Sequence, residues 1–130
     1  MNDSIRDVSL YVHFPYCKMR CTYCDFNTYV VEDIPNQTYS DAIVQEGDIR
    51  APAYGPSRLK TIYFGGGTPS LWGPASIQRL INRAKQWFTE TSESLEITLE
   101  CNPEEASVER LSQYAETGVT RLSLGVQSLQ

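Results

Sequence analysis

Ser9 to Cys24 read S-L-Y-V-H-F-P-Y-C-K-M-R-C-T-Y-C, a strand-like run that leads directly into three closely spaced cysteines. Ser9–Phe14 is rich in residues that favour β-structure and stops at Pro15, and the cysteines follow with three and then two residues between them. Packing alone does not explain three thiols so close together. In a reducing compartment, such a group more often binds a metal or serves catalysis than forms disulfides.

The metal that suits these cysteines is suggested by their number. A structural zinc site usually takes four protein ligands, and the remaining candidates are Cys101, far along the chain, and His13, inside the strand. A [4Fe-4S] cluster accepts thiolate ligands, and three of them would leave one iron open to another ligand. The residues alone therefore favour an iron–sulfur cluster, with zinc and unliganded redox thiols as the alternatives.

The rest of the chain alternates between strand and helix patterns. Further strands are predicted at Leu59–Phe64, Leu95–Glu100 and Val119–Leu124. A helix is predicted at Asn36–Arg50, where Gly47 weakens the pattern. A second begins at Pro74 and has Ile77, Leu80, Ile81, Ala84 and Phe88 at helical spacing. A third has its N-cap at Ser107, its apolar residues Val108, Leu111 and Ala115 inside, and its end at Gly118. This alternation predicts an α/β fold with about four parallel strands, as an open sheet or part of a barrel.

Polar or glycine-rich segments follow the predicted strands at the point where each strand ends. Gly65–Pro69 (GGGTP) follows the second strand, Glu100 closes the third, and Gln127 follows the fourth. The glycines permit close approach of the backbone to a ligand, whereas the Lys-Ser/Thr pair of a phosphate-binding P-loop is missing. Taken singly, each segment has an ordinary explanation as a turn or a solvated strand end. Because loops at this edge build the site in parallel α/β folds, together they predict a ligand site beside the cysteines.

Four motifs together resemble the radical S-adenosylmethionine (SAM) superfamily. They are Y-V-H-F-P-Y-C-K-M-R-C-T-Y-C-D-F-N, Y-F-G-G-G-T-P-S, L-E-C-N-P and R-L-S-L-G-V-Q-S-L, and the resemblance spans Leu10 to Leu129. More narrowly, they look like the group that contains oxygen-independent coproporphyrinogen III oxidase and heme chaperones of the HemW type. The resemblance implies the N-terminal portion of a partial (β/α)6 TIM-type barrel. We therefore expect residues 1–130 to be the N-terminal part of a radical SAM core domain, with the rest of the barrel and a C-terminal domain outside them.

The resemblance also implies a set of site residues. By the family pattern, Cys17, Cys21 and Cys24 bind a [4Fe-4S] cluster, and SAM chelates the open iron through its amino and carboxylate groups. The residues implied in cofactor binding are Tyr11 and Tyr23 beside the cluster, Gly66, Gly67 and Thr68 against SAM, Glu100 at its polar groups and Gln127 at a second polar edge.

One position separates the two functions within this group. In the oxidase a further cysteine stands two residues after the third cluster cysteine, and here that position is Phe26. The resemblance therefore implies a heme chaperone, which binds heme as cargo, delivers it to heme-requiring proteins and is reduced by a flavodoxin or ferredoxin. SAM cleavage is expected with it. The alternatives are coproporphyrinogen III oxidation and a non-enzymatic zinc-binding α/β module.

Composition and charge exclude other classes. The 130 residues include 16 acidic and 11 basic ones, a net charge of -5 that argues against non-specific nucleic-acid binding. No apolar run approaches the roughly 18 residues of a transmembrane segment, and Met1–Asp7 lacks the apolar core of a secretory signal. We therefore expect a cytoplasmic protein.

Five further residues have side chains that could serve a functional site, but we assign them structural roles. Cys101 is interpreted as a small buried residue at a strand end, and His13 as a hydrogen-bonded histidine beside the site. Trp72 and Trp87 are expected to pack, and Arg121, at the start of the last strand, to form an ion pair.

Overall fold

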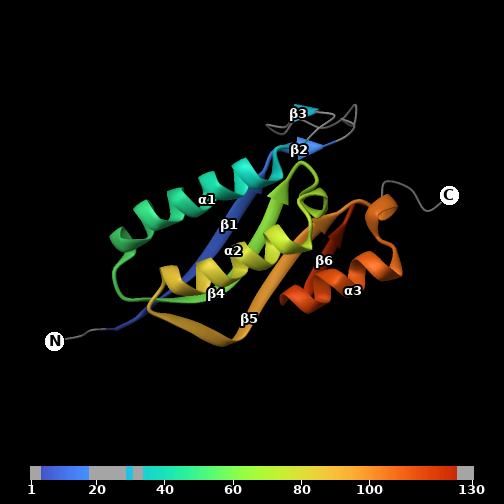
Figure 1. The fold of residues 1–130 in the computed structure, drawn as a ribbon. Coiled ribbons are helices and arrows are strands. Elements are labelled where there is room, and N and C mark those ends of the chain that lie inside the picture. The colour runs from blue at the N-terminus through green and yellow to red at the C-terminus, as the bar shows by residue number, and fades with distance from the viewer. Residues whose placement is uncertain (1–3, 18–28, 31–33, 126–130) are drawn as a thin grey trace.

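The computed structural model describes residues 4–17, 29–30 and 34–125. In this part of the chain, four parallel strands form one sheet in the order β1-β4-β5-β6, and two-residue strands β2 and β3 pair separately (Figure 1). The strands are β1 Arg6–Phe14, β2 Tyr16–Cys17, β3 Tyr29–Val30, β4 Ser57–Gly66, β5 Glu90–Cys101 and β6 Arg121–Leu124, and the helices are α1 Asn36–Arg50, α2 Pro74–Trp87 and α3 Val108–Thr117. The α/β class with four parallel strands alternating with helices is confirmed.

The boundaries of several elements differ from those predicted. Helix α1 has the predicted limits, but α2 ends at Trp87, and Phe88 already has extended backbone angles. Strand β5 begins at Glu90, five residues before the predicted start, because its first residues pair with β4 ahead of a register shift between Leu59 and Thr61. The β2–β3 pair was not predicted.

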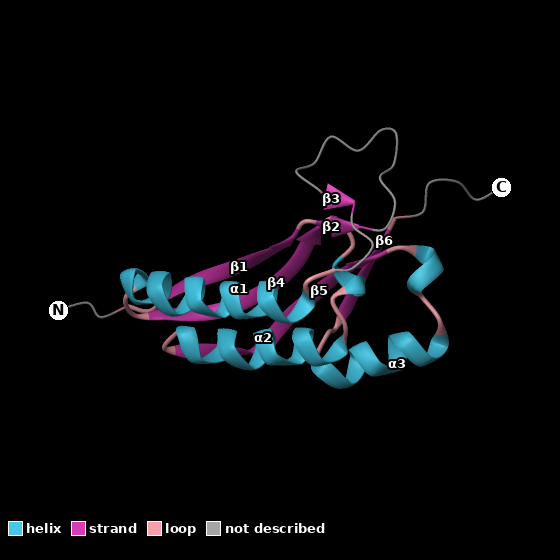
Figure 2. Cartoon of the chain, turned by 45° about the horizontal axis from the view of Figure 1, so that its top comes forward, coloured by secondary structure: helices cyan, strands magenta, loops and turns pink. Residues whose placement is uncertain are grey.

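All three helices cover one face of the sheet, and the apolar core lies between the two layers (Figures 1 and 2). Alternate strand residues point into it, so Val12 and Phe14 of β1 are buried whereas Tyr11 on the opposite face is 56% exposed. Trp72 is central to the core near the carboxyl ends of the strands. Its ring stacks on Phe14 with centroids 4.8 Å apart, and its indole N–H donates to Ser40 Oγ of α1 at 2.7 Å.

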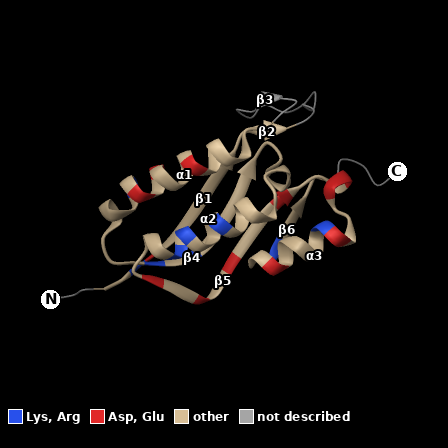
Figure 3. Ribbon diagram, viewed as in Figure 1, with Lys and Arg blue, Asp and Glu red and all other residues tan. Residues whose placement is uncertain are grey.

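Helices α1 and α2 pack through a close contact at Gly47. A Cβ atom at Gly47 would overlap the indole ring of Trp87. The ring can therefore occupy this position only because residue 47, in the middle of the helix, is glycine. The Trp87 indole N–H donates to Asp48 Oδ1 at 2.8 Å, and Arg83 pairs with Asp48 at 2.7 Å. Arg79 of α2 likewise pairs with Asp41 of α1 at 2.6 Å, so acidic side chains of α1 and basic side chains of α2 meet along this boundary. Figure 3 shows the acidic positions on α1 in red and the basic positions on α2 in blue. The predicted packing role of Trp87 accords with this geometry.

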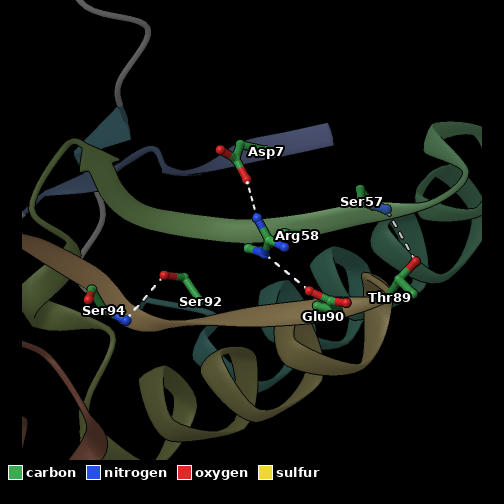
Figure 4. Close-up of polar contacts among 7 residues, drawn as sticks. All are labelled: Asp7, Ser57, Arg58, Thr89, Glu90, Ser92 and Ser94. Atoms are coloured by element: carbon green, nitrogen blue, oxygen red, sulfur yellow. Dashed lines mark hydrogen bonds and ion pairs between the residues drawn. The ribbon is translucent and has the colours of Figure 1, made fainter. Parts of the chain in front are cut away.

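A polar bridge ties three strands together at the amino end of the sheet (Figure 4). Arg58 of β4 contacts Asp7 of β1 at 3.2 Å and Glu90 of β5 at 3.1 Å. These side chains are largely exposed, and such pairs contribute about 1 kcal/mol or less each. Farther along the sheet, Arg121 pairs with Glu96 at 3.0 Å, which is the ion pair expected of it.

Helix α3 has the predicted caps but not the predicted apolar face. Ser107 accepts a hydrogen bond from the Arg110 amide at 3.1 Å, and Gly118 ends the helix with a φ of 109°. Val108, however, is 83% exposed, and the buried residues of this helix are Tyr114 and Thr117. The Tyr114 hydroxyl donates to the Ser70 carbonyl and accepts from the Gly73 amide, and the local apolar pattern does not show these partners in the segment after β4.

We predict that Gly47→Ala lowers the stability of the protein even though alanine favours helices. The new methyl group displaces the Trp87 ring, and overpacking of this kind costs about 1–3 kcal/mol. In a Trp87→Ala background, the same change should instead stabilise by up to about 1 kcal/mol, because only helix propensity remains. Urea unfolding of the four proteins measures both effects, and equal effects in the two backgrounds would contradict the contact.

Candidate functional site

The glycine-rich loop after β4 lies against the segment that leads into Cys17. The amide of Gly67 donates to the Phe14 carbonyl at 2.6 Å, and the amide of Thr68 donates to the Tyr16 carbonyl at 2.9 Å. Cys17 follows Tyr16 directly and is buried. These two main-chain bonds therefore hold the loop beside the first of the predicted metal ligands.

Glycine is required at two positions of this contact. Gly66 has a φ of 115°, and a Cβ atom there would lie 2.6 Å from the Phe14 carbonyl oxygen. A Cβ atom at Gly67 would lie 2.5 Å from the Tyr16 carbonyl oxygen. Because both neighbours are main-chain atoms, they cannot rotate away as a side chain would. The two glycines are what lets the loop approach the cysteine-bearing segment this closely.

The Glu100 carboxylate at the end of β5 is oriented by two donors. The Gly66 amide donates to Oε1 at 2.9 Å, and the Tyr63 hydroxyl donates to Oε2 at 2.8 Å. Each carboxylate oxygen has more than one acceptor position, so both can accept a further hydrogen bond. Glu100 therefore offers a fixed negative group to a ligand ammonium or hydroxyl.

Two tyrosines extend this arrangement across the open face of the sheet. The ring of Tyr11 stacks on Tyr63 with centroids 5.8 Å apart and an interplanar angle of 16°. Burial raises the pKa of the Tyr11 phenol, and the Glu100 charge raises it further. Burial likewise raises the pKa of the Tyr63 phenol, followed by its hydrogen bond to Glu100. Both hydroxyls therefore stay protonated at neutral pH, and Tyr63 remains a donor to the carboxylate.

The residues assigned structural roles beside the site have structural partners. His13 Nδ1 lies 3.3 Å from the Tyr11 hydroxyl, so the histidine is hydrogen-bonded as expected. Cys101 is 3% exposed, and its thiol donates to the Asn102 carbonyl at 3.3 Å. Burial raises the pKa of the Cys101 thiol, which keeps it protonated and poorly nucleophilic.

The structure brings six of the predicted site residues to one edge of the sheet. They are Tyr11, Cys17, Gly66, Gly67, Thr68 and Glu100. The other four, Cys21, Tyr23, Cys24 and Gln127, lie outside the described residues.

The sequence analysis missed two residues that orient the site. Tyr63 holds Glu100, and the side-chain amide of Asn102 donates to Thr68 Oγ1 at 3.3 Å. A signal for Tyr63 was present, since it stands two residues before Gly65 and so on the same face of β4. Asn102 directly follows the end of β5, where the loops of a parallel sheet meet.

A buried cysteine, a glycine loop hydrogen-bonded to the residue before it, and an oriented carboxylate thus converge where the strands end. The family of this chain follows from a comparison with protein-family models, in which the model of the radical SAM superfamily matches residues 11–130. The chain belongs to the radical SAM superfamily. Membership implies a [4Fe-4S] cluster and SAM as cofactors.

Similar radical SAM proteins carry two kinds of name. The chain is 40% identical over 121 residues to radical S-adenosyl methionine domain-containing protein 1, mitochondrial, of Mus musculus. It is 37% identical over 122 residues to heme chaperone HemW of Bacillus subtilis and 37% identical over 123 residues to that of Escherichia coli. These matches cover 93%, 94% and 93% of this chain, respectively, and 27%, 32% and 32% of the relatives. The chain therefore spans about a third or less of each relative's length.

A solved radical SAM structure has the same fold. Coproporphyrinogen III oxidase (HemN) from Escherichia coli matches with a TM-score of 0.87 and 34% sequence identity, over 97% of this chain and 29% of that chain. The expectation of part of a radical SAM barrel is thereby confirmed for the fold.

The residues of this edge fit the two cofactors that membership in the radical SAM superfamily implies. Thiolates are the usual ligands of iron–sulfur clusters, and the Cys17 thiol begins the triplet. The fixed Glu100 carboxylate suits the amino group or ribose hydroxyls of SAM, and the glycine loop leaves no side chain between its backbone and a ligand.

Among the described residues, no helix has the length and apolar character needed to cross a membrane.

We predict that Gly66→Ala lowers the stability of the protein more than Gly73→Ala does. Both glycines have positive φ, 115° and 101°, so both substitutions carry similar backbone strain. Only the methyl group at position 66 would meet main-chain and His13 atoms, whereas nothing lies within 4 Å of position 73. We expect Gly66→Ala to cost about 1–3 kcal/mol more in urea unfolding. Equal losses would show that the close approach is unimportant.

Proposed function

We propose that the protein is a radical SAM heme chaperone, which binds heme and delivers it to heme-requiring proteins. In this proposal Cys17, Cys21 and Cys24 hold the [4Fe-4S] cluster and SAM occupies its open iron. One observation carries the cofactor part: the Gly66–Thr68 loop hydrogen-bonds to the main chain immediately before Cys17. Ligands held by the loop and by the cysteines would therefore lie next to each other.

Two facts support the heme part of the proposal. Relatives at 36–38% identity over most of this chain are named heme chaperone HemW. In addition, the chain has Phe26 where the oxidase pattern has a further cysteine. The proposal extends to acceptor proteins that require heme, to a flavodoxin or ferredoxin as reductant, and to a cytoplasmic location.

The chain's own residues have distinct roles in this proposal. The Gly66 and Gly67 backbone and the Thr68 hydroxyl line the SAM position, Glu100 binds its polar groups, and Tyr63 keeps the carboxylate oriented. Tyr11 lies beside the site on the open face of the sheet, where its ring stacks on Tyr63. Tyr23 and Gln127 are proposed as further contacts to the cofactor. When bound, the reduced cluster and SAM supply one-electron cleavage chemistry, and the protein supplies orientation.

A second candidate is oxygen-independent oxidation of coproporphyrinogen III. The specific observation in its favour is the similarity to the solved coproporphyrinogen III oxidase, with a TM-score of 0.87 and 34% identity. Both candidates use the same cofactor site, so they differ in the tetrapyrrole that the rest of the protein receives. Superfamily membership favours either of them over the zinc-binding module.

We predict that Cys21→Ala abolishes the cluster whereas Cys101→Ala leaves it intact. Loss of one of three thiolate ligands removes a bond to iron, whereas the Cys101 thiol is buried and donates to the carbonyl of its own neighbour, Asn102. Iron and labile-sulfide analysis of the anaerobically reconstituted full-length protein measures this. A full cluster in the Cys21→Ala protein would refute the ligand assignment.

Heme titration separates the two candidate functions. We expect the full-length protein to bind heme saturably and near stoichiometrically, with growth of a distinct Soret band. A protein that binds no heme, but converts coproporphyrinogen III to a decarboxylated product with SAM and a reductant, would contradict the chaperone and establish the oxidase. The Cys21→Ala variant is the matched control, because it should lose SAM cleavage in either case.

A further inference from the structure

The turn that follows the glycine loop is held from behind by helix α3. Ser70 lies in the short 3-10 turn Pro69–Leu71 and is fully buried. Its carbonyl accepts two side-chain hydrogen bonds, one from the Tyr114 hydroxyl and one from the Arg110 guanidinium at 3.0 Å. A carbonyl has two lone pairs, so both are used here.

The same Tyr114 hydroxyl also bonds to Gly73, two residues after this turn ends. It accepts a hydrogen bond from the Gly73 amide at 3.3 Å, directly before α2 begins. One buried hydroxyl therefore links Ser70, just after the glycine loop, to Gly73, just before α2. Burial raises the pKa of the Tyr114 phenol, so the hydroxyl stays a donor to Ser70 at neutral pH. Arg110 stacks over the Tyr114 ring, 5.6 Å from its centroid.

The loop is thus fixed from two opposite sides. On one side, the amides of Gly67 and Thr68 bond to β1 and the residues that lead into Cys17. On the other, α3 holds Ser70, two residues after Thr68, through Tyr114. Thr68 lies between these two sets of contacts in the sequence. It is 4% exposed, and its hydroxyl accepts a hydrogen bond from the Asn102 side chain. A shift of Ser70 would be passed to Thr68 through the rigid Pro69 between them.

We propose that Tyr114, assisted by Arg110, is a positioning residue that keeps the Gly66–Thr68 loop at the SAM position. It acts through the Ser70 carbonyl and touches no cofactor itself. The inference rests on the proposed SAM-binding role of the loop. It extends that role to α3, the helix that links β5 to β6 on the covered face of the sheet (Figure 2).

The test is Tyr114→Phe in the full-length protein with a reconstituted cluster. The change removes one oxygen and leaves the ring in the core. We expect the iron and sulfide content to stay at the wild-type level while the Kd for SAM rises about fivefold, the effect of one hydrogen bond of about 1 kcal/mol. The Kd is measured from the change that added SAM causes in the electron paramagnetic resonance spectrum of the reduced cluster.

Three further variants make the outcome specific. Tyr54→Phe removes a hydroxyl from a 44% exposed tyrosine in the turn after α1 and should match the wild type. Thr68→Val changes the loop itself and should weaken SAM binding without loss of iron. Arg110→Lys keeps the charge but alters the second donor to Ser70, and it tests the same anchor if Tyr114→Phe fails to hold a cluster.

The results distinguish failure of the inference from failure of the proposed function. If Thr68→Val weakens SAM binding but Tyr114→Phe, with a full cluster, binds like the wild type, the positioning role is wrong and the loop assignment stands. A lower Tm for Tyr114→Phe with an unchanged Kd leads to the same conclusion. If the wild-type protein shows no spectral response to SAM, both the positioning role and the proposed cofactor site are overturned.

Discussion

Two main-chain hydrogen bonds, from Gly67 to Phe14 and from Thr68 to Tyr16, are the constraint on which the rest of the site depends. They exist only because no Cβ atom stands between the loop and the carbonyls of the facing segment. A loop displaced by one methyl group would also withdraw the Gly66 amide from Glu100. The oriented carboxylate and the cysteine-bearing segment are thus coupled through backbone atoms.

The parallel sheet brings the glycine loop, Glu100 and the segment before Cys17 together at its carboxyl edge. The contacts at its amino edge are of a different kind. All strands end at the same edge, so residues far apart in sequence meet there. The amino end carries exposed ion pairs around Arg58, which bind three strands but face no ligand site in the described part of the chain (Figure 4). This division follows the general rule that the carboxyl edge carries chemistry and the other edge stability.

The sequence predicted the elements whose signals are local. Strand β1 stops at Pro15 and α3 is bounded by Ser107 and Gly118, and each of these residues acts on its own neighbours. The start of β5 at Glu90 was missed because its polar residues owe their strand geometry to pairing with β4 across a register shift. The buried face of α3 was misjudged because the partners of Tyr114 lie about 40 residues away. The candidate site residues were inferred from motif spacing and resemblance. Of the residues that orient them, Tyr63 had a signal in its position two residues before Gly65, whereas the contact of Asn102 with Thr68 emerges only from the folded structure.

The burial of Trp72 gives the protein an intrinsic optical reporter. The indole is 1% exposed, stacks on Phe14 and follows the glycine loop by five residues, whereas Trp87 lies at the distant boundary between α1 and α2. Fluorescence depends on the polarity and quenching groups around an indole, so the two tryptophans sense different parts of the molecule. In a Trp87→Phe background, Trp72 would be the one remaining tryptophan among the 130 residues. Its fluorescence quantum yield would then report the packing beneath the Gly66–Thr68 loop without an added label.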